Sequence, residues 1–220
     1  MTSNISFYSR EEELLNAWSH AAGILLAILT GVLFIIWCAG HSDGLAVWGV
    51  SLYLFGMLGS YVASTVYHAL PIDNLWKAHL RKWDHAAIYW HIAGSYSPLT
   101  LAVMWNQSAW GLVLFIFVWV CALLGSVMSF AAVKGKKSKL ETVCYIAMGL
   151  CVLVAFRPLL SSAGIVAVAW IIAEGVCYIT GALFYSLRRK FMHSVFHFFV
   201  LAGSICHIIA IWQALMLYFG

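Results

Sequence analysis

The feature that most constrains this chain is a series of long apolar stretches separated by short polar ones. A helix needs about 20 mostly apolar residues to cross a bilayer. Seven stretches come close to that length: roughly 19–40, 44–67, 85–105, 109–132, 141–159, 163–186 and 192–218. Hydrophobic residues make up 64% of the chain and charged residues 9%, whereas soluble domains carry about 25% charged residues. The sequence therefore predicts an all-α integral membrane protein, a single seven-helix transmembrane domain over residues 1–220.

The basic residues predict how the chain is oriented in the membrane. Lysine and arginine favour the cytoplasmic side. Of the 12 basic residues, all but Arg157 lie near the N-terminus or in the segments 71–84, 134–139 and 187–190. Seven spans put these segments on one side, whereas six or eight would separate the last cluster from the others. We therefore expect a cytoplasmic N-terminus and an outside C-terminus, and the net charge of +4 indicates no nucleic-acid partner.

Two further features argue against other classes of protein. The N-terminal segment SREEELLNAWSH is acidic before the first apolar stretch, so we expect no cleavable signal peptide. Six cysteines occur, all in apolar stretches and none in a CxxC pair. We therefore expect small buried thiols rather than a disulfide framework or a cysteine metal site.

A small set of polar residues lies at the predicted cytoplasmic ends of the spans. His193 and His197 are four residues apart and project from one face of the last span. Two imidazoles at that spacing can bind one metal ion, as in helical zinc motifs, and His68 could supply a third nitrogen. Three protein ligands plus a water is the pattern of a catalytic zinc site. Asp84 could bind that water or orient a ligand, and Ser64, one turn before His68, could support the site.

An HxxxH pair alone is a weak signal, because paired histidines near a membrane surface can simply lie at the headgroup level. The metal hypothesis is stronger here because the three histidines and the aspartate come from three separate spans yet share one predicted depth. Ionisable residues inside membrane helices are costly and usually face the protein interior or a cavity. The sequence therefore points to a shared site at this depth.

Six further polar residues lie in or beside the spans: Glu12, Asn16, His20, His91, Glu174 and His207. The first three share one helix face, which could support the site or merely face the interface. His91 could line a cavity below the site or hydrogen-bond a neighbouring helix, and the second reading is favoured. His207 is interpreted as a structural hydrogen-bonding residue. Glu174, in the middle of a span, needs a partner or stays protonated.

Four stretches of the chain resemble the bacterial hemolysin III family, a branch of the progestin and adipoQ receptor superfamily. They are EELLNAWSHAAG (12–23), STVYH (64–68), LRKWDHAAIYWHIAGSYSPLTL (80–101) and HSVFHFFVLAGSICH (193–207). They occur in family order and cover nearly the whole length of the chain. The resemblance implies seven helices, a cytoplasmic N-terminus and a place in the bacterial cytoplasmic (inner) membrane.

The resemblance also implies a zinc ion near the cytoplasmic side. Its ligands would be His68, His193 and His197, with Asp84 reaching the zinc through a water and Ser64 belonging to the family's SxxxH element. An all-histidine set with an open position suits zinc better than calcium or magnesium.

Such a site predicts hydrolytic chemistry. Three neutral imidazoles leave zinc its full positive charge, which lowers the pKa of a bound water toward about 7. Asp84 could then take the proton as a general base and pass it to a leaving amine, while Ser64 hydrogen-bonds the intermediate or orients Asp84. We therefore expect a zinc-dependent hydrolase of a lipid amide, or of an ester, that acts in membrane lipid homeostasis. The alkaline ceramidases are similar in their zinc motifs.

Two other classes of function stay open. Animal relatives act as hormone receptors, so the zinc could be structural in a non-enzymatic membrane sensor or regulator. The family name implies hemolysis by a pore-forming or membrane-perturbing activity. A pore is disfavoured because no helix carries the row of charged or small polar residues that an aqueous channel usually needs. The expected partner in each case is the bilayer, with a membrane lipid as substrate or ligand.

Overall fold

The computed structural model describes residues 8–131, 139–187 and 189–220, and these residues contain helices and no strand. The elements in chain order are α1 Arg10–Gly40, α2 Gly44–Ala69, α3 Lys77–Pro98, the π-helix η1 Leu99–Val103, α4 Trp110–Ala131, α5 Lys139–Leu150, the 3₁₀-helix η2 Cys151–Ala155, α6 Phe156–Ser186 and α7 Met192–Phe219. The all-α prediction is confirmed. Residues 134–138 of the predicted basic loop, and Arg188, lie outside the described residues.

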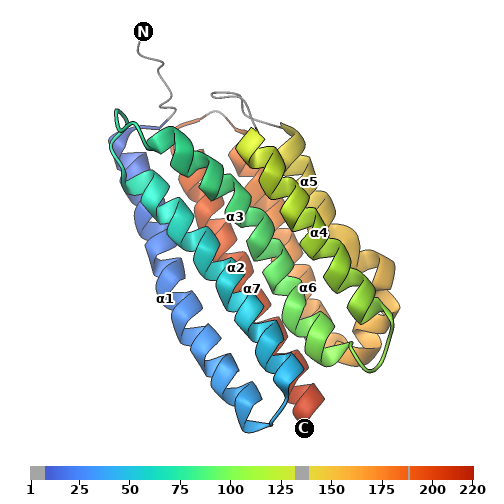
Figure 1. Ribbon diagram of the computed structural model, residues 1–220. Coiled ribbons are helices and arrows are strands. Elements are labelled where there is room, and N and C mark those ends of the chain that lie inside the picture. Colours follow the sequence, from blue (N-terminus) through green and yellow to red (C-terminus); the bar gives the residue numbers. More distant parts are fainter. Residues whose placement is uncertain (1–7, 132–138, 188) are drawn as a thin grey trace.

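The helices form one elongated bundle, in which α1 begins at one end and α7 finishes at the opposite end (Figure 1). The most extensive contacts join α2 to α3 and α6 to α7, and α7 also packs against α1. α5 is the shortest of the α-helices and the most loosely packed, since it makes only sparse contacts with α3, α4 and α6.

Within the described residues, five helical stretches are long and apolar enough to cross a membrane. They are α1, α2, α4, α7 and the continuous run Leu140–Ser186, which is 47 residues long. α3 is not among them, because its first turns carry charged side chains such as Lys77, Arg81 and Asp84. The structure therefore supports an integral membrane protein, and the count of seven spans stays a prediction.

Gly164 divides the 47-residue run into two helical segments. Its backbone, at φ 79° and ψ 162°, is non-helical, in a region that is essentially restricted to glycine. The segment after Gly164 runs antiparallel to α7, since Gly164 lies against Leu217 near the end of α7 and Gly181 lies against Phe196 near its start. The break falls one residue inside the predicted sixth span, 163–186.

The segment before Gly164 follows α3 in the same direction. Glu141 hydrogen-bonds His85 near the start of α3 at 3.0 Å, and the Val152 amide donates to the Tyr96 hydroxyl near its end at 3.1 Å. The chain therefore reverses at Gly164, close to the predicted boundary between the fifth and sixth spans.

Glycine allows α2 and α3 to approach closely. A Cβ atom at Gly56 would collide with the Trp90 carbonyl oxygen, and one at Gly94 would lie 2.8 Å from the Leu52 carbonyl oxygen. Small residues at such positions let two membrane helices bring their backbones together, which is how helices pack where no hydrophobic effect drives them.

Two predicted boundaries differ from the observed helices. α1 begins at Arg10 rather than near residue 19, and α3 begins at Lys77 within the segment expected as an inner loop, 71–84. Both extra turns are polar, so a search for apolar stretches excludes them. They are helical because Ser9 and Glu12 form a capping box at the start of α1, and because Lys77 is held by hydrogen bonds inside the protein.

We expect Gly164→Ala to lower the free energy of unfolding by about 1–3 kcal/mol, because alanine is strained at this φ and ψ. Gly175→Ala is the matched control: it lies in the same helix with open space around it, and should be neutral or stabilising by about 0.5–1 kcal/mol. Thermal unfolding of the detergent-purified protein measures both. Equal melting temperatures for the two variants would contradict the assigned turn.

Candidate metal centre

Three histidines converge where the end of α2 meets the start of α7. His193 Nε2 lies 3.4 Å from His68 Nε2 and 3.0 Å from His197 Nε2, and one ligand atom from each histidine lies within 4.8 Å of the others. His68 and His197 are buried, whereas His193 is partly exposed. The three predicted ligands are thus brought together by helices that are more than 120 residues apart in the chain.

The donor set fits a tetrahedral metal ion. Histidine nitrogens lie about 2.0–2.1 Å from zinc, so two ligands in a tetrahedral site are about 3.3–3.4 Å apart. The observed separations of 3.0 and 3.4 Å bracket that value. Neutral imidazoles that turn their lone pairs toward one another repel, and a cation between them removes the repulsion. The cluster could therefore hold a metal ion.

The opposite ring nitrogens of His68 and His197 are hydrogen-bonded, which orients these two rings. His68 Nδ1 lies 2.5 Å from Glu13 Oε2, and His197 Nδ1 lies 3.4 Å from Ser19 Oγ. A proton on His68 Nδ1, donated to the carboxylate, leaves Nε2 free to coordinate a metal. Carboxylate–histidine pairs of this kind fix the tautomer and raise the basicity of a metal ligand.

Glu13 is a residue of this site that the sequence did not single out. It is 5% exposed, and its second oxygen accepts from Lys77 Nζ at 2.9 Å. Lys77 also donates to the carbonyls of Tyr67 and Leu70, so its charge is fully surrounded by acceptors. The spacing could have indicated Glu13, because Glu13, Asn16 and His20, at i, i+3 and i+7, lie on one face of a helix. Glu12, at i, i+4 and i+8 with the same two residues, fits that face equally well and was preferred.

The face of α1 that carries Glu12, Asn16 and His20 supports the start of α7. Glu12 accepts from the Phe191 amide at 2.7 Å, and Asn16 Oδ1 accepts from Ser194 Oγ at 2.6 Å. The His20 ring stacks on the His197 ring, with centroids 3.8 Å apart. Of the two readings that the sequence left open, these contacts favour support of the site.

Tyr8 covers the cluster on its exposed side. Its ring stacks on His193 with a centroid distance of 4.5 Å and an interplanar angle of 19°. Burial raises the pKa of Tyr8, so the hydroxyl stays neutral beside the histidines. Nothing in the sequence singled out this residue, because it precedes the first apolar stretch.

A cavity of about 260 Å³ opens beside the cluster. Its wall includes Ser64, Asp84, His193 and His197. Ser64 is buried and Asp84 half-buried. Asp84 lies outside the group of three nitrogen ligands and lines the same cavity as His193 and His197.

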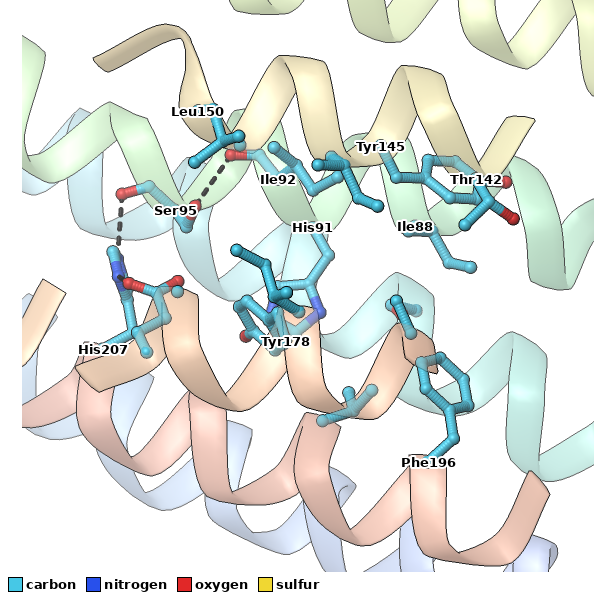
Figure 2. A pocket seen from close by; sticks show the side chains of 18 of the residues that line it. Ile88, His91, Ile92, Ser95, Thr142, Tyr145, Leu150, Tyr178, Phe196 and His207 are labelled. Carbon is cyan, nitrogen blue, oxygen red and sulfur yellow. Dashed lines mark hydrogen bonds and ion pairs between the residues drawn. The ribbon is translucent and has the colours of Figure 1, made fainter. Parts of the chain in front are cut away.

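The same cavity continues deep into the bundle, between α3, α5, α6 and α7 (Figure 2). His91 lines it, which is the other of the two roles that the sequence left open for this residue. Glu174, for which the sequence suggested no partner, pairs with His207 Nδ1 at 2.6 Å. His207 is hydrogen-bonded as predicted.

Comparisons with known proteins agree with these motifs. The chain matches the family model described as haemolysin-III related over residues 8–208. It is 32% identical to a hemolysin-3 of Bacillus cereus over 195 residues, 88% of this chain and 87% of that protein. It is also 32% identical to a hemolysin-3 homolog of Bacillus subtilis over 198 residues, which are 90% of this chain and 91% of that protein. The human monocyte to macrophage differentiation factor is 26% identical over 217 residues, 93% of this chain and 84% of that protein.

Purified wild-type protein should contain about one divalent metal ion per chain, because three imidazoles and an open position form a complete protein ligand set. The double variant His193→Ala/His197→Ala should lose it, since one ligand remains. His79→Ala, an exposed histidine on α3, is the control and should keep the metal. Elemental analysis by mass spectrometry measures the content. Metal retained by the double variant, or found in neither protein, would refute the assignment.

Glu13→Gln should lower metal affinity about 10- to 100-fold, the range seen when a partner of a metal-bound histidine is removed. The amide can hold His68 in place but lacks the negative charge that makes the ring a stronger ligand. Glu11→Gln, on the same helical turn but exposed, should leave the affinity unchanged. Competition with a chelating dye gives both constants, and equal values would show that Glu13 is only structural.

Proposed function

Because the chain belongs to the haemolysin-III related family, we propose that it is a zinc-dependent hydrolase that cleaves an amide bond of a membrane lipid. The single observation that carries the proposal is that His193 and His197, two of the three clustered histidines, line the same apolar cavity as a carboxylate, Asp84. An open, three-ligand arrangement is typical of catalytic rather than structural zinc sites. The match to the human relative is consistent with the wider progestin and adipoQ receptor superfamily.

The donor set favours zinc. Calcium and magnesium prefer oxygen ligands, whereas imidazoles suit zinc and its transition-metal neighbours. When bound, zinc supplies Lewis-acid chemistry: it polarises a carbonyl group and makes water acidic enough to ionise near neutral pH. His68, His193 and His197 would hold the ion.

The remaining steps belong to the side chains on the cavity wall. Asp84 would accept the proton of the attacking water and deliver it to the departing amine, a general-base then general-acid role. Ser64 would donate a hydrogen bond to the developing oxyanion or hold Asp84 in position. Tyr8, stacked on His193, would limit the access of bulk water to the site.

The apolar side chains of α5 and α6 on the cavity wall suit a lipid substrate. Ile146, Leu150 and Ile179 line the cavity and are 36%, 42% and 42% exposed. A lipid acyl chain that enters between α5 and α6 would pass from the bilayer into the cavity without crossing water. Ligand sites are usually apolar clefts with a few fixed polar groups, which describes this space.

We place the protein in the bacterial cytoplasmic membrane with seven passes and its N-terminus in the cytoplasm. The placement is supported by the basic segment 71–84, which lies at the end of the bundle where α1 begins (Figure 1), and by Lys190, which lies 3.9 Å from Glu11 at the start of α1. It is also supported by the turn at Gly164. α3 would be the least apolar pass.

One observation favours a second candidate, a non-enzymatic sensor in which the metal is structural. The network of His68, Glu13 and Lys77 joins α1, α2 and α3, and His193 adds α7. A metal at their meeting point would hold four helices together and could stabilise one conformation of the bundle.

Asp84→Asn should reduce hydrolysis of a ceramide-type lipid amide by about 10²–10⁴-fold, the usual contribution of a general base. Metal content and melting temperature should stay near wild type, because Asp84 lies outside the three-nitrogen cluster. The assay uses protein reconstituted in liposomes, with free fatty acid measured by mass spectrometry.

Absence of product from metal-loaded wild type, over a panel of lipid amides and esters, would overturn the hydrolase. A large fall in melting temperature on metal removal, together with that absence, would favour the structural sensor. Ion leakage from the same liposomes that is indifferent to Asp84→Asn would favour the membrane-perturbing activity suggested by the family name.

A further inference from the structure

A second polar group of side chains lies deep in the cavity, away from the histidine cluster. It consists of His91 and Ser95 from α3, Glu174 from α6 and His207 from α7, which we call the deep polar cluster. His207 is ten residues beyond His197 on α7, so the two sites are about 15 Å apart along the helix. Figure 2 shows His207 beside Ser95 at one end of the cavity and Phe196 toward the other.

The hydrogen bonds give the Glu174–His207 pair a net charge of zero. His207 Nε2 lies 3.0 Å from the Ser95 carbonyl oxygen, which can only accept, so Nε2 carries a proton. The 2.6 Å contact between Nδ1 and Glu174 Oε2 contains a second proton. Whichever atom holds that proton, a carboxylate with an imidazolium or a carboxyl with an imidazole, the pair is neutral overall. It suits a neutral ligand group better than a cation.

Two groups in this cluster keep hydrogen-bonding capacity. Glu174 Oε1 has no hydrogen-bond partner among the described residues, and neither ring nitrogen of His91 has one. The Tyr53 ring lies near both histidines, with centroids 6.5 Å from His91 and 5.2 Å from His207, and its buried hydroxyl also lacks a partner there. Glu174 and His91 line the cavity, so a ligand that enters it and forms hydrogen bonds to them would be bound more tightly.

We propose that the deep polar cluster is a second binding point in the cavity, which takes a neutral hydroxyl group carried in the middle of a lipid chain. The hydroxyl would donate to Glu174 Oε1 and accept from the N–H of His91. The polar end of the same lipid would lie at the histidine cluster, about 15 Å away, with apolar chain in contact with the wall between. The inference rests on the proposed function only for the ligand being a lipid, since binding requires no metal and no turnover.

The test is competition binding in detergent solution against radiolabelled octadecanoic acid. The competitors are octadecanoic acids with a hydroxyl at carbon 2, 10 or 12, and the unsubstituted acid. A mid-chain hydroxyl should improve binding about two- to tenfold, the range of one net hydrogen bond, and the 2-hydroxy acid should show no gain. An equal affinity for every acid would overturn the proposal, as expected if only water occupies the cluster.

Variants assign the effect to the cluster. His91→Phe keeps a ring but removes its N–H groups, and Glu174→Gln keeps a group that can bond His207; each should abolish the mid-chain preference while leaving the affinity for the unsubstituted acid within about twofold. Using both protects the test against one variant failing to fold. Thr142→Val, which removes a hydroxyl from the cavity wall near the opposite end (Figure 2), should keep the preference.

The outcomes separate this proposal from the hydrolase. A preference that survives both cluster variants would overturn the deep binding point, whatever the activity of the protein. A preference that depends on them, measured with and without a chelator, would support it even if no lipid is hydrolysed.

Discussion

The hydrogen bond between His68 and Glu13, balanced by Lys77, is the interaction on which the rest of this structure depends. In a bilayer, a buried charge must be paired inside the protein. Here the Glu13 carboxylate is buried between the His68 imidazole and the Lys77 ammonium. The ammonium also donates hydrogen bonds to two backbone carbonyls. This network joins α1 to the end of α2 and the start of α3, and it turns the His68 nitrogen Nε2 toward α7. The need to pair the buried Glu13 charge therefore both holds these helices together and orients His68 as a metal ligand.

The cavity has polar groups at two depths, and each is organised by a carboxylate and a histidine. At one end Glu13 orients His68 beside the other two histidines. Deeper in the bundle Glu174 pairs with His207. Between them the walls are mostly apolar, and α5, the most loosely packed α-helix, forms one side. Polar ends and an apolar middle are the features that a cavity for an amphiphilic lipid requires.

Sequence reasoning went far with the fold and with the ligand set, because both depend on local properties. Apolar stretches predicted an all-helical membrane protein, and the HxxxH spacing placed His193 and His197 on one face. Sequence reasoning was less successful where either of two neighbouring polar residues could contact the same side chain. Glu12 and Glu13 are adjacent in sequence, yet only Glu13 reaches His68, while Glu12 accepts from the amide of Phe191. The rotation of α1 decides between them, and the rotation is set by packing.

The sequence by itself determined the class of protein, the approximate helices and the residue types that can bind a metal. Length and polarity control membrane insertion, and four-residue spacing controls which side chains share a face. Only the tertiary structure decided that Glu174 pairs with His207, that His91 faces a cavity and that the chain reverses at Gly164. Those outcomes depend on contacts between residues on different helices, or on a single backbone conformation, and neither leaves a periodic trace in the sequence.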